Sequence, residues 1–205
     1  MPSTLTGLIA ILRGLTPEEA PAVGRALYEA GFRTLEVPLN SPNPLESIRL
    51  LRKDLPQDIQ VGAGTVLTPA QVADVAAAGG QLIVSPNANT EVIAATVDSG
   101  LASYPGVATP SEAFAALSAG ATALKIFPSE TVGIAGMKAW SSVLPAGTQL
   151  LPVGGVDDQT LGTWLQAGAA GAGVGSWLYK PGRSIDEIAE RAASLVTVWT
   201  THTAA

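Results

Sequence analysis

Eight short apolar segments, separated by the signals of helix starts and ends, predict an α/β fold in which helices cover a parallel sheet. The segments recur at intervals of about 20 to 26 residues, and their apolar runs are continuous, as in strands buried on both faces. The economical closure of eight such units is a (β/α)8 TIM barrel. An open doubly wound sheet is the alternative, because 205 residues are near the lower size limit of a barrel. The length predicts one domain over residues 1–205, with 201–205 as a flexible tail.

The expected strands and helices follow one another in a regular order. The strands are Leu8–Leu12, Leu35–Pro38, Ile59–Ala63, Leu82–Val84, Leu101–Tyr104, Ala123–Phe127, Leu150–Val153 and Ala172–Val174. Four helices are expected to begin with capping boxes, in which Ser or Thr precedes Glu or Gln by three positions, at 16–19, 68–71, 109–112 and 184–187. Helices are expected to end at Gly31, Gly79, Gly100, Gly120 and Gly168.

The composition excludes several classes of function. A net charge of -6 gives no field that would attract nucleic acid or an anionic membrane. The chain has no cysteine, and its one histidine is His202, so thiolate or histidine metal sites and Ser-His mechanisms are not expected. No signal segment or membrane-spanning run is recognised, which predicts a cytoplasmic protein. Catalysis must therefore use lysine, arginine, carboxylates, hydroxyls or the backbone.

Three ionisable residues interrupt or end the apolar strands. Lys125 lies between Leu124 and Ile126, where burial would lower its pKa and make a free amine available for a Schiff base. Glu36 is the one acidic residue inside an expected strand and could exchange protons, while Arg13 ends the first strand and could hold a carboxylate or a phosphate. The alternatives are a structural Lys125 paired with a carboxylate, and a salt bridge from Glu36 to Lys125 or Arg13. Together the three predict a catalytic mouth, because active sites of barrels lie at the carboxyl ends of the strands.

Glycine-rich segments follow the expected strands three, seven and eight. Gly154 and Gly155 follow strand seven, and Gly175 and Ser176 follow strand eight. In barrels the loops after these two strands commonly bind phosphate through backbone N–H groups, although each segment alone could be a tight turn. Thr65 closes strand three and offers a hydroxyl at the mouth, or serves only as a turn into the next helix.

These residues together resemble the KHG/KDPG aldolase family of class I aldolases. The matching segments are AILRG at Arg13, LEVPLNSP at Glu36, GAGTVL at Thr65, SPN at Pro86, YPG at Pro105, LKIFPS at Lys125, PVGGV at Gly154 and GVGSWLY at Ser176. They occur in order over residues 8–179, so the resemblance covers most of the chain. Within the family the phosphogalactonate branch is the closer likeness, because Asn40 and Val153 stand where the phosphogluconate branch typically has arginine and threonine.

The resemblance implies a lyase that cleaves 2-dehydro-3-deoxy-6-phosphogalactonate to pyruvate and D-glyceraldehyde 3-phosphate, in galactonate degradation, without a metal or organic cofactor. It implies Lys125 as the Schiff-base residue and Glu36 as the proton-transfer residue. The implied substrate contacts are Arg13, Thr65, Pro86, Pro105, Phe127, Gly154, Gly155, Gly175 and Ser176. It also implies a homotrimer. The alternatives are the phosphogluconate epimer or both epimers as substrate, a phosphate-binding barrel isomerase, and a non-catalytic sugar-phosphate binder.

Overall fold

The computed structural model describes residues 7–203, in which short strands alternate with helices. The strands are β1 (Leu8–Ile11), β2 (Thr34–Pro38), β3 (Gln60–Gly64), β4 (Leu82–Val84), β5 (Ala102–Tyr104), β6 (Gly106–Val107), β7 (Leu124–Ile126), β8 (Leu150–Pro152) and β9 (Ala172–Val174). The helices are α1 (Ala20–Ala30), α2 (Pro44–Asp54), α3 (Pro69–Ala77), α4 (Thr90–Asp98), α5 (Pro110–Ser118), α6 (Ser129–Ser141), α7 (Leu161–Gln166) and α8 (Ile185–Thr203).

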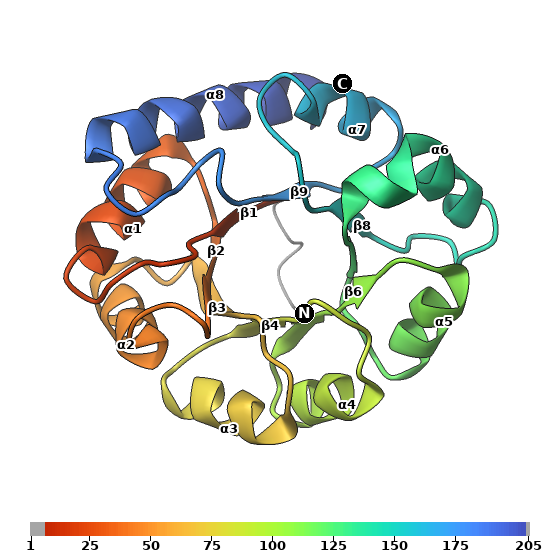
Figure 1. Ribbon diagram of the computed structural model, residues 1–205, viewed down its shortest axis with the longest axis horizontal. Coiled ribbons are helices and arrows are strands. Elements are labelled where there is room, and N and C mark those ends of the chain that lie inside the picture. Colours follow the sequence, from red (N-terminus) through yellow and green to blue (C-terminus); the bar gives the residue numbers. More distant parts are fainter. Residues whose placement is uncertain (1–6, 204–205) are drawn as a thin grey trace.

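All paired strands run parallel, and they surround a central axis with the helices outside (Figure 1). They form two hydrogen-bonded sheets, in the orders β5-β4-β3-β2-β1-β9 and β6-β7-β8. A single bridge between Val153 and Gly173 links the β8 side to β9. The fifth expected strand, Leu101–Tyr104, is found as β5, and a further short strand that was not predicted, β6, follows Pro105, which has no N–H to donate to a ladder. The parallel α/β sheet is therefore confirmed, and its ladders close the ring only in part.

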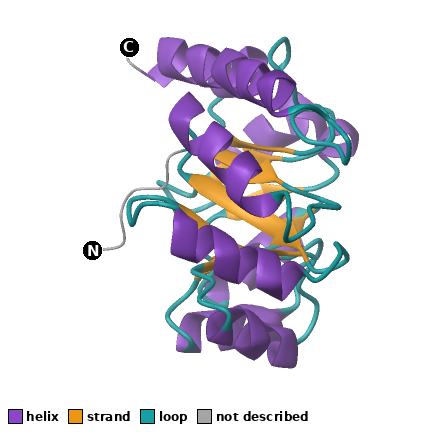
Figure 2. Cartoon of the chain, turned by 90° about the vertical axis from the view of Figure 1, so that its left-hand side faces the viewer, coloured by secondary structure: helices purple, strands orange, loops and turns teal. Residues whose placement is uncertain are grey.

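Alternate residues of the strands face two different cores. Leu35, Val37, Leu124 and Ile126 point outward and pack with the helices in the larger core. A smaller cluster lies inside the ring of strands and comprises Ile9, Leu82, Val84, Tyr104, Ala123 and Leu151. In Figure 2 the strands lie between helices, which cover the outer face of the sheet, while the smaller cluster fills its inner face. An ionisable side chain that points inward therefore enters an apolar interior.

The helix signals in the sequence are confirmed at most positions. Thr68 makes the complete capping box with Gln71, and the five glycines expected at helix ends all have positive φ. The predicted start of the first helix is wrong. Thr16 accepts a hydrogen bond from the Glu19 amide at 3.4 Å, but residues 17–19 form a turn and α1 begins at Ala20.

The expected flexible tail at 201–205 is helical as far as Thr203, and residues 204–205 lie outside the described part. His202 is held there because its Nδ1 contacts the Val198 carbonyl at 2.8 Å and its Nε2 contacts Gln166 of α7 at 3.3 Å. Between residues 7 and 203, none of the helices has the length and apolar character that crossing a membrane requires.

Candidate active site

The inward-facing residues of β2 and β7 include a buried carboxyl group and a buried amine. Glu36 is 2% exposed and Lys125 is 8% exposed, and both line a small internal cavity of about 10 Å³ together with Tyr104 and Val84. Their neighbours along the strands, Leu35 and Leu124, face outward, so the period of two in a strand points Glu36 and Lys125 inward. The structure thus brings together the two residues that stood out in the sequence.

Burial shifts both groups toward their neutral forms. It raises the pKa of Glu36 from 4.5 to about 7, against the opposing charges of Lys125 and Arg13. It lowers the pKa of Lys125, an effect that the Glu36 carboxylate opposes and the Arg13 charge reinforces. Both displacements have the same cause, since removal from water disfavours a charged form of either sign.

The salt bridges offered as structural alternatives do not form among residues 7–203, where the ion pairs within 4.0 Å involve neither Glu36 nor Lys125. The Lys125 Nζ atom instead lies 4.6 Å from the centre of the Phe127 ring. Arg13 donates to the Asn40 side-chain oxygen at 2.6 Å. Arg13 is exposed at the mouth, so its guanidinium can reach an anionic substrate without being buried.

Two residues at the end of β3 shape the space around the carboxylate. A Cβ at Gly64 would overlap the Glu36 carboxylate, so any larger residue there would force the buried carboxylate to move. Thr65 follows with φ of +56°, a left-handed conformation that a β-branched residue rarely adopts. Strained backbone of this kind concentrates at functional sites. The structure places half-buried Thr65 at the carboxyl end of β3, as the sequence predicted.

A larger cavity of about 710 Å³ extends from this mouth over the carboxyl ends of β8 and β9. Six of the residues singled out in the sequence line it, namely Arg13, Phe127, Gly154, Gly155, Gly175 and Ser176. Pro86 and Pro105 do not line it: Pro86 lies at the end of β4 with its carbonyl against Gly106, and Pro105 is buried between β5 and β6. The glycine loops therefore meet in a cavity that shares Ile11, Val153 and Gly173 with the small cavity lined by Lys125 and Glu36.

The structure adds residues that the sequence did not single out. Lys180, which reads as an ordinary loop lysine in the sequence, lines the large cavity together with Arg183 and Arg191. Ser129 fixes the loop after β8, because its hydroxyl donates to the Gly154 carbonyl at 2.6 Å and its amide donates to Val153 at 3.0 Å. Nothing in the local sequence distinguishes the three cations, whereas Ser129 lies within the LKIFPS segment that carries the resemblance.

Metal ligands do not gather in the described part of the chain. Between residues 7 and 203 no three His, Asp or Glu side chains are grouped so that they could hold a metal ion. The chemistry that the arrangement itself can perform is that of an amine and a carboxyl group, next to a cavity lined by cations and glycine amides.

Comparison with known proteins places the chain in a family. The profile of the KDPG and KHG aldolases matches residues 3–190. The 2-dehydro-3-deoxy-6-phosphogalactonate aldolase of Escherichia coli K12 is 48% identical over 192 residues, covering 94% of both chains. A probable 2-dehydro-3-deoxy-6-phosphogalactonate aldolase of Rhizobium meliloti is 46% identical, covering 94% of this chain and 91% of the relative. A solved structure described as native KDPGal superposes with a TM-score of 0.96 at 46% identity, over 99% of this chain and 98% of the other.

These matches define the protein as an enzyme of the lyase class. The chain belongs to the KDPG and KHG aldolase family.

Proposed function

We propose that the protein cleaves 2-dehydro-3-deoxy-6-phosphogalactonate to pyruvate and D-glyceraldehyde 3-phosphate through a Schiff base on Lys125. One observation carries the proposal: a buried lysine of lowered pKa and a buried glutamate whose pKa is about 7 line the same small cavity. The identity of 48% with the E. coli phosphogalactonate enzyme supports this choice of substrate.

Bond formation in this mechanism starts at Lys125. The neutral amine attacks the C2 ketone of the substrate, and the carbinolamine loses water to give a protonated imine. The Glu36 carboxylate then accepts the proton of the C4 hydroxyl, directly or through a water, and the C3–C4 bond breaks. The electron pair of that bond moves into the imine and forms an enamine, while glyceraldehyde 3-phosphate leaves as the aldehyde.

The second half of the reaction returns the enzyme to its starting state. Protonated Glu36 gives its proton to C3 of the enamine, which regenerates the imine, and water hydrolyses the imine to pyruvate and the Lys125 amine. A carboxyl group with a pKa near neutrality suits both directions of transfer, because each form is populated at the working pH.

The other site residues are proposed to hold the two anionic ends of the substrate. Arg13 and Thr65 bind the carboxylate next to the ketone, and Phe127, Pro86 and Pro105 shape the pocket. The phosphate binds at the other end, to the backbone and hydroxyl groups of Gly154, Gly155, Gly175 and Ser176. The position of the last four around one cavity supports this assignment.

We further propose that the partly closed ring of strands is a (β/α)8 barrel, counting β5 and β6 as one strand, and that the enzyme is a cytoplasmic homotrimer. Leu67, Val97 and Phe114 are more than two-fifths exposed, which supports apolar contacts between copies. Light scattering tests the assembly: a mass about three times 20.7 kDa is expected, and 20.7 kDa would contradict it.

The decisive experiment is borohydride trapping with pyruvate, followed by intact mass measurement and peptide mapping. A reduced pyruvyl adduct is expected on Lys125 and is expected to be absent in Lys125→Ala. Lys138→Ala, which removes an exposed lysine of α6, is the matched control and keeps the adduct. If the folded wild-type protein forms no adduct, the Schiff-base mechanism is wrong, and an isomerase or a sugar-phosphate binder takes its place.

Comparison of the two epimers then tests the substrate. A larger kcat/KM is expected for the phosphogalactonate than for the phosphogluconate compound. Equal or reversed values would assign the enzyme to both epimers or to the gluconate epimer.

A further inference from the structure

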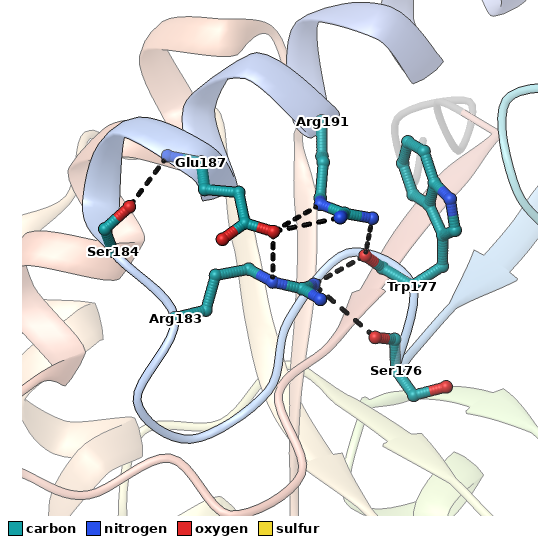
Figure 3. A network of polar contacts seen from close by, with 6 residues as sticks. All are labelled: Ser176, Trp177, Arg183, Ser184, Glu187 and Arg191. Carbon is teal, nitrogen blue, oxygen red and sulfur yellow. Dashed lines mark hydrogen bonds and ion pairs between the residues drawn. The ribbon is translucent and has the colours of Figure 1, made fainter.

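A compact network of charges lies where the loop after β9 enters α8, and the mechanism above does not use it (Figure 3). It consists of Arg183, Glu187 and Arg191, here called the Arg-Glu-Arg cluster. One oxygen of the Glu187 carboxylate lies 3.1 Å from Nε of Arg183, 3.0 Å from Nε of Arg191 and 2.9 Å from Nη2 of Arg191. The carboxylate thus holds both guanidinium groups in place.

The two arginines bind the backbone of the loop that precedes them. Arg183 Nη1 donates to the Trp177 carbonyl at 2.5 Å and to the Ser176 carbonyl at 3.4 Å, and Arg191 Nη1 donates to the Trp177 carbonyl at 3.0 Å. The Arg191 guanidinium also lies 4.9 Å from the Trp177 ring. Hydrogen bonds from a charged donor are roughly twice as strong as neutral ones. The cluster therefore fixes the carbonyl groups of residues 176 and 177.

Those two carbonyl groups belong to the turn that carries the proposed phosphate ligands. Within the turn, the amides of Leu178 and Tyr179 both donate to the Gly175 carbonyl at 2.9 Å. Each carbonyl lies in one plane with the N–H of the next residue. Fixing the carbonyls of Ser176 and Trp177 consequently fixes the amides of Trp177 and Leu178, and the two bonds to the Gly175 carbonyl fix the amide of Ser176. The backbone of the turn beside the cavity is thereby held in one conformation.

The arginines of the cluster are more buried than the arginine of an ordinary surface ion pair. The Arg183 side chain is 10% exposed and that of Arg191 is 30% exposed, whereas Arg25, paired with Asp54 between α1 and α2, is 53% exposed; Glu187 itself is 44% exposed. A buried guanidinium that loses its partners is costly, so the cluster is held in one geometry. Since Arg183 and Arg191 both line the large cavity, this geometry lies directly beside the phosphate end.

We propose that Arg183, Glu187 and Arg191 are positioning residues that set the affinity of the enzyme for the phosphate group of its substrate. The inference rests on the proposed function, in which Gly175 and Ser176 hold the phosphate. If the cluster acted only through its charge, removal of the Glu187 carboxylate would change phosphate affinity in the opposite direction. Removing the Glu187 charge adds one positive charge beside the phosphate and would tighten binding, whereas loss of the carboxylate that holds the arginines loosens the turn and weakens binding.

The test measures KM and kcat of the full-length protein for the phosphorylated substrate and for the same sugar acid without phosphate. Glu187→Gln and Arg183→Gln are each expected to raise KM for the phosphorylated substrate, by on the order of tenfold for Arg183→Gln, with kcat within about twofold. For the substrate without phosphate, KM is expected to change by less than about twofold, because the affected contacts are absent. Arg25→Gln, which breaks an exposed ion pair, is the control and leaves both KM values unchanged.

Two results would overturn the proposal: a lower or unchanged KM in Glu187→Gln, or full recovery in Arg183→Lys, which keeps the charge but not the forked donor. Titration calorimetry with inorganic phosphate tests the same proposal without a catalytic assay. Both glutamine variants are expected to bind phosphate more weakly than the wild-type protein. If the wild-type protein binds phosphate but cleaves neither sugar acid, the proposed function fails while the role of the cluster is still decided.

Discussion

Replacing Glu36 with glutamine is expected to remove a pH-dependent cost of folding. Burial raises the pKa of Glu36 from its ordinary value of 4.5 to about 7. Between these values the folded protein keeps a proton that the unfolded chain has released, so the free energy of unfolding falls as the pH rises through this window. At about 1.36 kcal/mol per pH unit, the loss from pH 4.5 to pH 7 is about 3 kcal/mol.

The assay is urea unfolding followed by tryptophan fluorescence, at equal protein concentration, from about pH 4.5 to pH 8. The unfolding free energy of the wild-type protein is expected to fall by about 3 kcal/mol relative to Glu36→Gln over this range, because glutamine does not ionise. Glu29→Gln, on the exposed face of α1, is the control and follows the wild-type profile. Parallel profiles for wild type and Glu36→Gln would refute the reasoning, since they would mean that Glu36 titrates alike in the folded and unfolded states.

Two further substitutions test the packing around the same residues. Gly64→Ala places a methyl group against the Glu36 carboxylate, so a loss of about 1 to 3 kcal/mol in stability is expected. A fall in kcat of at least about tenfold is also expected, because the carboxylate proposed to transfer protons is displaced, and a fully active variant would contradict this reasoning. Tyr104→Phe removes a buried hydroxyl that has no hydrogen-bond partner among residues 7–203, so stability is expected to stay equal or rise by up to about 1 kcal/mol. A lower melting temperature would show that the hydroxyl is satisfied.

The strands could be predicted because apolar runs buried on both faces leave a continuous signal in the sequence. Lys125 and Glu36 could be found for the same reason, since a charged residue inside such a run is rare and costly. The short strand β6 after Pro105 was not predicted, because a proline at the end of an apolar run ends a strand or only interrupts it, depending on the neighbouring ladder. The start of α1 shifted because the contacts between Thr16 and Glu19 form within a turn, before the helix.

At the proposed phosphate end of the site, the sequence predicted the glycines and Ser176 but not the cations. Arg183 and Arg191 lie in a loop and in a helix, where cations are common and nothing local marks them. Their position beside Ser176 depends on the path of the chain from β9 into α8 and on the charge of Glu187. Lys180 was missed for the same reason. The chain carries a net charge of -6, so a cationic end of the cavity is a product of tertiary structure that composition conceals.

The absence of an ion pair between Lys125 and Glu36 in the described structure has a chemical consequence. A tight pair would hold each group in its charged form, and a protonated lysine cannot attack a ketone. Burial without pairing lowers the pKa of Lys125, which makes its neutral amine more available, and brings the pKa of Glu36 to about 7, which suits proton exchange near neutrality. Gly64 makes room for the carboxylate, and the Phe127 ring 4.6 Å from the Lys125 nitrogen offers a weak partner for the positive charge of the proposed imine. The apolar interior of the strands therefore tunes both groups, and neither has to neutralise the other.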